Sequence, residues 1–241
     1  MHRFFAGRLD DRRAELLPEE VPHALRVLRL QAGDAAELLM EGEKWSAEIC
    51  SIEGQRVICR LQGRLPSAEP GVEVTLFQGL PKAEKMEWVI QKATELGAAR
   101  ICAVAMERSV AKIGGREADK KRERWQKIAC EAVKQSGRCR APEVRICTLS
   151  EAAEMARDLD LFLVPWEEES GLRLSGVLAK REKSQGRIGL LIGPEGGISK
   201  NEVELLRQAG ALPVSLGRRI LRTETAALAA LAAVMALSGE M

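Results

Sequence analysis

The residues best suited to chemistry lie in a glycine-rich segment late in the chain. Residues 193–197 read Gly-Pro-Glu-Gly-Gly and follow an apolar run at 190–192. Glycine permits positive φ angles and lets a ligand approach the backbone closely. Ser199 is a good helix N-cap, and Glu202 three residues later completes a capping box. The pattern predicts a strand, a ligand-binding loop and a helix, with the loop at the edge where α/β sheets bind small molecules.

A second candidate site is the segment 216–226, Leu-Gly-Arg-Arg-Ile-Leu-Arg-Thr-Glu-Thr-Ala. A short strand ends at Gly217, a basic loop follows, and Glu224 suits the start of a helix because of the helix dipole. The helix from Ala226 carries small and aliphatic side chains, which let backbone or a partner chain approach. An alternative interpretation is that Arg222 and Glu224 form only a local ion pair at the helix cap.

Several kinds of site are excluded by what the sequence lacks. The glycine spacing is neither G-x-G-x-x-G nor a Walker A loop, so it does not support NAD or ATP phosphate binding. His2 and His23 are the only histidines, which argues against a histidine-based triad or a multi-histidine metal site. The six cysteines form no C-x-x-C pair, so we expect reduced, structural thiols and no metal.

The composition is that of a folded protein. The chain has 241 residues, of which 46% are hydrophobic and 30% are charged, and its net charge is +2. A disordered chain has fewer apolar residues and a larger net charge. The longest apolar run, 226–237, is too short to span a bilayer. The N-terminus has no apolar signal core, so we expect a soluble, cytoplasmic protein.

A Pro- and Ser-containing linker at 65–71 divides two regions that differ in their expected secondary structure. Before it, strands expected at 37–40, 45–52 and 56–61 are separated by glycine turns and indicate a small β-barrel, beside a short helix at 23–30. After it, strands alternate with helices, which favours a largely parallel sheet with helices on both faces. The strands are expected at 74–80, 100–106, 159–164, 187–192 and 213–216, and the helices at 84–97, 119–135, 172–183, 199–208 and 224–238.

Positive charge is concentrated in residues 100–145. This stretch holds 13 Lys and Arg against 6 Asp and Glu. It is either a solvated helix face or a surface that binds the phosphates of a nucleic acid.

The two glycine- and arginine-containing motifs together resemble those of a known family. LLIGPEGGIS together with LGRRILRTETA resembles the SPOUT methyltransferases, and specifically the RsmE family of ribosomal RNA uridine N3-methyltransferases. The segments KAEKMEWVIQKATELGA, QKIACEAVKQSGR and HALRVLRLQAGD, and the opening MHRFF, are also similar to that family. The resemblance covers nearly the whole chain.

The resemblance implies a fold, a cofactor and partners. Residues 1–69 would form a PUA-like RNA-binding β-barrel, and residues 70–241 an α/β trefoil-knotted SPOUT methyltransferase domain with a mostly parallel sheet. S-adenosylmethionine would bind among three knot loops, which match residues 164–166, 193–197 and 216–223 here. The enzyme would be a homodimer that methylates N3 of a single uridine of 16S ribosomal RNA in the assembled small subunit.

Given such a reaction, the chemistry of N3 methylation predicts roles for particular residues. Arg222 would supply a cation beside the reacting base, and Glu224 or Glu195 would accept its proton or hold loop backbone in place. Phosphate contacts are expected from Arg3, Arg26, Arg29, Arg108, Arg138 and Arg140. Cofactor contacts are expected from Val164, Pro165, Ile192, Gly193, Pro194, Gly196, Gly197, Leu216, Gly217, Ile220, Leu221, Arg222, Thr223 and Thr225.

Other functions stay open at this point. A knotted methyltransferase could modify a ribose 2′-hydroxyl or a different base. An RNA-binding assembly factor could keep the cofactor fold without turnover. A dinucleotide-dependent oxidoreductase is a distant third because the glycine fingerprint is missing.

Overall fold

The chain separates into two compact units. The computed structural model describes residues 1–82, 84–109, 115–180 and 186–241. One unit comprises Met1–Glu69 with Val133–Arg140, and the other comprises Pro70–Ala132 with Ala141–Met241. The sequence places a single boundary near residue 70 and gives no sign that 133–140 belongs with the first unit.

The first unit is built on a closed five-stranded barrel. Its strands are β1 (His2–Arg8), β2 (Arg13–Leu16), β3 (Ala35–Met40), β4 (Glu43–Glu53) and β5 (Arg56–Leu65), in the order β1-β2-β5-β4-β3. Parallel pairing of β1 with β3 closes the barrel. Phe4, Leu38 and Ile49 fill it. The predicted barrel is confirmed, although the sequence pattern did not indicate β1 or β2. The helix expected at 23–30 is a single helical turn, η1 (His23–Val27).

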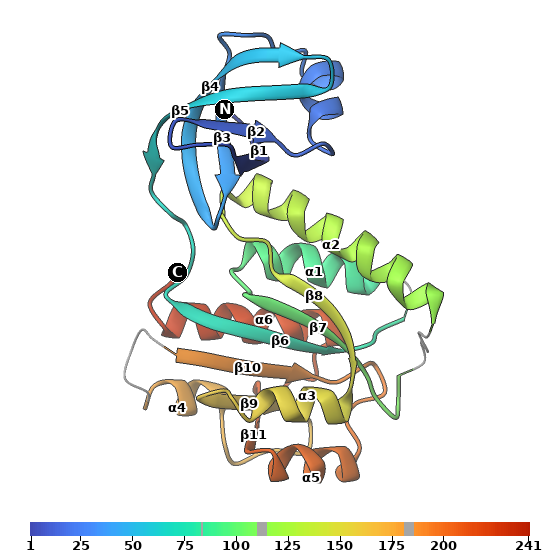
Figure 1. The fold of residues 1–241 in the computed structure, drawn as a ribbon. Helices are drawn as coiled ribbons and strands as arrows, with labels where there is room; N and C mark the ends of the chain where they lie inside the picture. Colours follow the sequence, from blue (N-terminus) through green and yellow to red (C-terminus); the bar gives the residue numbers. More distant parts are fainter. Residues whose placement is uncertain (83, 110–114, 181–185) are drawn as a thin grey trace. The chain divides into compact units, whose positions relative to one another are not determined.

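The second unit contains a six-stranded sheet, shown in Figure 1. Each neighbouring pair of strands is parallel, which confirms the sequence prediction. Along the sheet the order is β11-β9-β10-β6-β7-β8. The strands are β6 (Val72–Gly79), β7 (Arg100–Ala105), β8 (Glu143–Thr148), β9 (Leu161–Pro165), β10 (Gly186–Ile192) and β11 (Ala211–Val214).

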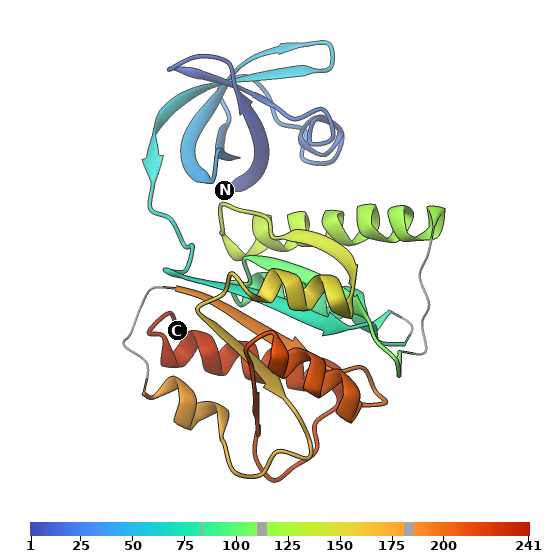
Figure 2. The same cartoon turned by 60° about the horizontal axis from the view of Figure 1, so that its bottom comes forward.

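Helices cover both faces of this sheet. The helices are α1 (Lys85–Glu95), α2 (Arg116–Ser136), α3 (Leu149–Ala156), α4 (Leu174–Leu178), α5 (Lys200–Gln208) and α6 (Thr223–Leu237). Side chains of α1, α4 and α6, with Trp125 of α2, share one apolar core with the sheet. The helices α3 and α5 pack on the other face, as Figure 2 shows. Successive side chains of β6 point to opposite faces of the sheet, so Leu76 packs in the first core and Phe77 in the second.

Some elements differ from the sequence prediction. The strand β8 and the helix α3 were not indicated by the pattern. The helix expected at 172–183 is only α4, Leu174–Leu178, and positions 181–183 lie outside the described residues. The predicted capping box is confirmed: Ser199 Oγ accepts from Glu202 N, and a Glu202 carboxylate oxygen accepts from Ser199 N. Within the described ranges, no helix is both long enough and apolar enough to cross a membrane.

Candidate functional site

A cavity of about 520 Å³ lies at the carboxyl ends of β9, β10 and β11. Three loops line it, one after each strand, and all belong to the second unit. Parallel strands present their carboxyl ends at one edge, so these loops meet there although they are far apart in the sequence. The volume falls in the range of small-molecule sites.

The glycine-rich loop is held by close contacts that leave no room for side chains. A Cβ on Gly79, at the end of β6, would lie 2.6 Å from the backbone nitrogen of Pro194. A Cβ on Gly196 would lie 2.9 Å from the Cβ of Arg108, whose Nη1 donates to the Gly196 carbonyl oxygen at 3.0 Å. These glycines therefore let the loop pack against β6 and against the segment after β7.

Replacing Gly79 with alanine is expected to lower the free energy of unfolding by about 1–3 kcal/mol, because the new methyl group meets backbone that must move. Gly176→Ala is the matched control, since Gly176 lies in α4 with open space around its Cβ position. That control should be neutral or slightly stabilising. Urea denaturation measures both, and equal stability of the two variants would contradict the packing described above.

The loop before α6 lines the cavity and has backbone amides without an acceptor in the described part of the chain. Among the described residues, the backbone amides of 218–222 have no acceptor. The position of this loop is set at its end by a buried chain of hydrogen bonds. Gln78 Nε2 donates to Thr223 Oγ1 at 2.8 Å, and Thr223 Oγ1 donates to the Gly193 carbonyl oxygen at 2.6 Å. Thr223 thus ties the second candidate segment to the first.

Two carboxylates beside the cavity share one ammonium group. Lys85 Nζ lies 3.1 Å from Glu195 Oε1 and 3.1 Å from Glu224 Oε2. The Lys82 amide also donates to Glu195, at 3.1 Å. Partial burial opposes ionisation of Glu195, but hydrogen bonds from backbone amides and from Lys85 hold the pKa of this carboxyl below its ordinary value. Glu195 and then Glu224 raise the pKa of Lys85, which stays protonated.

Most of the predicted cofactor residues line the cavity. These are Pro165, Ile192, Gly193, Pro194, Gly197, Leu216, Gly217, Ile220, Leu221, Arg222 and Thr223. Three others do not line it. Val164 is buried in β9, Gly196 packs on Arg108, and Thr225 is exposed on α6. The lining residues Trp166, Arg218 and Arg219 belong to the loops expected to hold the cofactor, although no contact of their own was predicted for them. Lining residues outside those loops are Lys85, Glu167, Ile198, Ser215 and Ala226.

The residues predicted to do chemistry are brought together. Arg222 and Glu195 line the cavity, and Glu224 lies beside it through Lys85. The alternative of a local ion pair between Arg222 and Glu224 is wrong, because Glu224 pairs with Lys85 of α1. Arg222 is exposed and pairs with no carboxylate in the described part of the chain. Its guanidinium group is therefore available to a ligand.

Two of the arginines expected to bind RNA hold the first unit together. Arg138 is 4% exposed, and its guanidinium donates to Glu69 Oε2 at 2.7 Å. Arg3 donates to Glu37 at 2.7 Å and to the backbone carbonyl of Lys134 at 2.6 Å. Burial and these pairings argue against a phosphate contact for Arg138 and make one unfavourable for Arg3.

The remaining arginines of that set are exposed. Arg26 and Arg29 lie at η1, and the structure pairs neither with a described carboxylate. Arg29 has a positive φ of 56°, which is uncommon outside glycine. Arg140 packs against Gly42 of the barrel, and Arg108 supports the glycine loop. Arg26 and Arg29 are the best placed of the set to meet an external phosphate.

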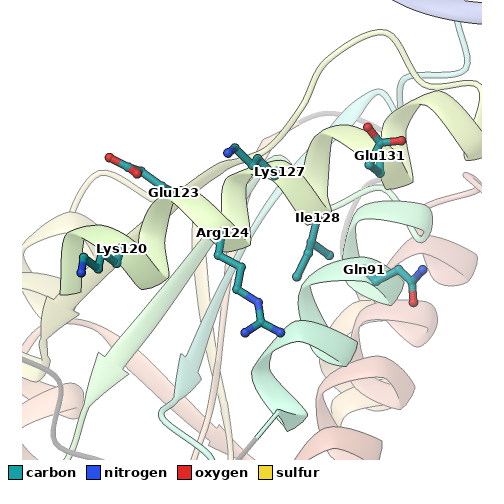
Figure 3. A pocket seen from close by; sticks show the side chains of 7 residues that line it. All are labelled: Gln91, Lys120, Glu123, Arg124, Lys127, Ile128 and Glu131. Carbon is teal, nitrogen blue, oxygen red and sulfur yellow. The ribbon is translucent and has the colours of Figure 1, made fainter. Parts of the chain in front are cut away.

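A second hollow lies between α1 and α2, where the positive charge of the sequence is densest (Figure 3). Figure 3 shows Arg124 extending from α2 toward α1, where it pairs with Glu87 at 2.8 Å. The hollow also contains Lys120 and Lys127, but Glu123 and Glu131 offset their charge. Because the charges nearly balance, the hollow favours the interpretation of α2 as a solvated face.

Comparison with known proteins gives matches over nearly the whole chain. A family model described as an RNA methyltransferase domain matches residues 68–235, and one described as an RNA methyltransferase PUA domain matches residues 16–62. Ribosomal RNA small subunit methyltransferase E of Bacillus subtilis is 37% identical, over 90% of this chain and 87% of its own. The protein of the same name from Aquifex aeolicus is 31% identical over 98% and 99%.

A solved structure is similar throughout. The ribosomal RNA small subunit methyltransferase E of Neisseria gonorrhoeae, crystallised with S-adenosyl methionine, superposes with a TM-score of 0.84. It is 31% identical to this chain, and the match covers 98% of each protein. Among the described residues, no group of three or more His, Cys, Asp or Glu side chains could hold a metal ion.

Proposed function

Because this chain belongs to the ribosomal RNA small subunit methyltransferase E family, we propose that it methylates N3 of a single uridine of 16S ribosomal RNA. The methyl donor is S-adenosylmethionine, and the proposed uridine is the one at position 1498. The observation that carries the proposal is the cavity formed by the three loops that follow β9, β10 and β11.

The residues of this cavity fit S-adenosylmethionine. Unused backbone amides at 218–222 can donate to the acceptor nitrogens of an adenine ring. Ile192, Leu216 and Leu221 supply apolar walls for the ring, and the glycines of the 193–197 loop allow close approach. Glu167, which also lines the cavity, can accept from hydroxyl or ammonium groups. These are the residues we propose to hold the cofactor.

Methyl transfer needs a nucleophilic nitrogen more than it needs a strong acid or base. When bound, the cofactor supplies an electrophilic methyl group on a sulfonium and takes away the bond electrons as a neutral thioether. Uridine N3 is protonated at neutral pH and attacks only after losing that proton. We propose that Arg222 lies against the uracil and stabilises the anion, which lowers the free energy of deprotonation.

The geometry favours a holding role for Glu195. Its pKa is held below the ordinary value, so its carboxylate is a weak base for the N3 proton. It also accepts from Lys82 N and from Lys85, which join the glycine loop to the start of α1. We therefore propose that Glu195 and Glu224 orient the loops, and that water accepts the proton once Arg222 stabilises the anion.

The barrel unit is proposed to bind the RNA backbone through Arg26 and Arg29. Each phosphate contact releases a counterion, so each charge deletion is expected to lower the salt slope of binding by about one unit. Arg26→Gln and Arg29→Gln test this by binding titrations of the small subunit across salt concentrations. Arg157→Gln is the control, because Arg157 is already ion-paired with Glu154. Salt slopes equal to that of the unmodified protein would show that Arg26 and Arg29 contact no phosphate and are only solvated surface residues.

We propose a homodimer in which both chains contribute to the RNA site. Support comes from α6, whose outward face carries small apolar side chains such as Ala229 and Ala236. Leu237, on the same helix, is 40% exposed. A bare apolar face is favoured at an interface between chains. Light scattering that gave the mass of a monomer would contradict the shared site.

The family resemblance also supports a trefoil knot in the second unit. The three loops that would form it are the ones that meet at the cavity. Since the proposed substrate is a ribosomal subunit, we expect the protein to act in the cytoplasm.

The proposal is tested by transfer of labelled methyl groups. The purified protein is incubated with S-adenosylmethionine labelled on the methyl group, with small subunits lacking their native methylations, and with bare 16S RNA in parallel. Label in subunits and not in bare RNA is the expected result. Binding of the cofactor without transfer to either substrate would favour a non-catalytic RNA-binding role.

A further inference from the structure

Lys85 joins three parts of the cofactor cavity that are far apart in the sequence. It lies in the first turn of α1, Glu195 lies in the loop after β10, and Glu224 lies in the first turn of α6. Its nitrogen is 3.1 Å from an oxygen of each carboxylate. It also lines the cavity itself.

We propose that Lys85 is a positioning residue, whose ammonium group holds Glu195 and Glu224 together and so fixes both cofactor loops against α1. We call this arrangement of Lys85, Glu195 and Glu224 the Lys85 clamp. Its relevance to catalysis rests on the proposed function, whereas its contacts are a property of the chain. Loss of the Lys85 contacts would therefore loosen the glycine loop and the start of α6 at the same time.

The charge of Lys85 is what the arrangement requires. The two carboxylates contact the same nitrogen, so without it they would face each other at a distance where like charges repel. Both are partly buried, with side-chain exposures of 26% for Glu195 and 16% for Glu224, so water screens them only in part. An uncharged side chain of similar length would fill the space of Lys85, but the two carboxylates would still repel each other.

Other contacts keep the loops attached when Lys85 is replaced. The Lys82 amide still donates to Glu195, and the hydrogen bonds from Gln78 through Thr223 to Gly193 do not involve Lys85. A Lys85 variant should therefore fold, with a local loosening confined to the two loops. This makes the proposal testable in an intact protein.

The test compares Lys85→Met, Lys85→Arg and the double variant Lys85→Met/Glu195→Gln with the unmodified chain. Amide hydrogen exchange without cofactor is the first readout, since it reports local opening. Lys85→Met should speed exchange of the Gly197 and Ala226 amides, which donate to the carbonyls of Pro194 and Arg222, by about tenfold, with the barrel strands unchanged. Lys85→Arg keeps the charge and should restore slow exchange. Removing one carboxylate charge in the double variant should recover most of the protection.

Affinity for S-adenosylmethionine is the second readout. Lys85→Met is expected to weaken it by about tenfold, and Lys85→Arg and the double variant should each bind more tightly than Lys85→Met. Lys92→Met is the matched control, since Lys92 pairs only with Glu95 on the same helix in the described part of the chain. This control should leave both readouts unchanged.

Two results would overturn the clamp. One is equal exchange in Lys85→Met and Lys85→Arg, and the other is a double variant no better protected than Lys85→Met. Failure of the proposed function is distinguishable from either. If the unmodified protein binds no cofactor, the function fails, while the exchange experiment still decides whether Lys85 holds the loops.

Discussion

Replacing Arg222 with alanine is expected to lower the rate of methyl transfer by about a hundredfold to a thousandfold. Arg222 lines the cavity and has no carboxylate partner among the described residues, so its charge is free to act on a ligand. Removing it leaves the uracil anion without the cation proposed to stabilise it. The measurement is single-turnover transfer from labelled S-adenosylmethionine to small subunits.

Cofactor affinity separates a catalytic from a structural effect of this change. The loop before α6 is anchored by Thr223 and the Gly193 carbonyl, which Arg222→Ala leaves in place, so affinity should change by no more than a few fold. Arg207→Ala, on the exposed face of α5, is the control and should transfer at the normal rate. Parallel loss of affinity and turnover would make Arg222 a structural residue of the loop.

Replacing Glu69 with glutamine is expected to destabilise the barrel unit by about 3 kcal/mol at neutral pH. The carboxylate receives hydrogen bonds from the buried Arg138 guanidinium at 2.7 Å and from the amides of Cys139 and Arg140 at 2.6 and 2.9 Å. The neutral amide leaves the charge of Arg138 poorly compensated. It also loses one of the oxygens that accept these bonds. Urea denaturation followed by a barrel signal measures the loss.

The pH dependence of this effect has a definite sign. Burial opposes ionisation, but Arg138 and the two amides hold the pKa of Glu69 below its ordinary value of 4.5. The carboxylate therefore stabilises the folded chain above pH 4.5, and this contribution is lost as the pH falls through the folded pKa. The difference in unfolding free energy between the unmodified protein and Glu69→Gln should therefore become smaller as the pH is lowered.

A surface pair provides the control for Glu69. Glu41 pairs with Arg8 in the same unit, but its side chain is 59% exposed. Exposed pairs contribute about 0–1 kcal/mol, so Glu41→Gln should be nearly silent. Equal effects of the two substitutions, or a gap for Glu69→Gln that widens in acid, would contradict the buried pairing.

The cavity was largely predictable because its determinants are local in the sequence. Glycines, a proline and a capping box follow one another within residues 193–202, and this order specifies a strand, a loop and a helix. Lys85 was missed because its role depends on two carboxylates more than a hundred residues away. The signal available was its position just after β6, at the same edge of the sheet.

The fold was predictable where strands are buried on both faces. The apolar run of β10 stands out, whereas β8 lies at the edge of the sheet and alternates charged with apolar residues. Arg138 shows the limit of charge patterns. It belongs to a basic stretch by sequence, but Glu69, distant in the chain, determines that it is buried and paired.

The identity of the methylated nucleoside tests the central claim most directly. Small subunits lacking native methylations are labelled by the protein, their 16S RNA is digested, and the labelled nucleoside is identified by chromatography and mass spectrometry. We predict that the label is found in 3-methyluridine at a single position. Label in a ribose-methylated nucleoside or in another base would contradict uridine N3 as the target, even though the cavity and its cofactor would stand.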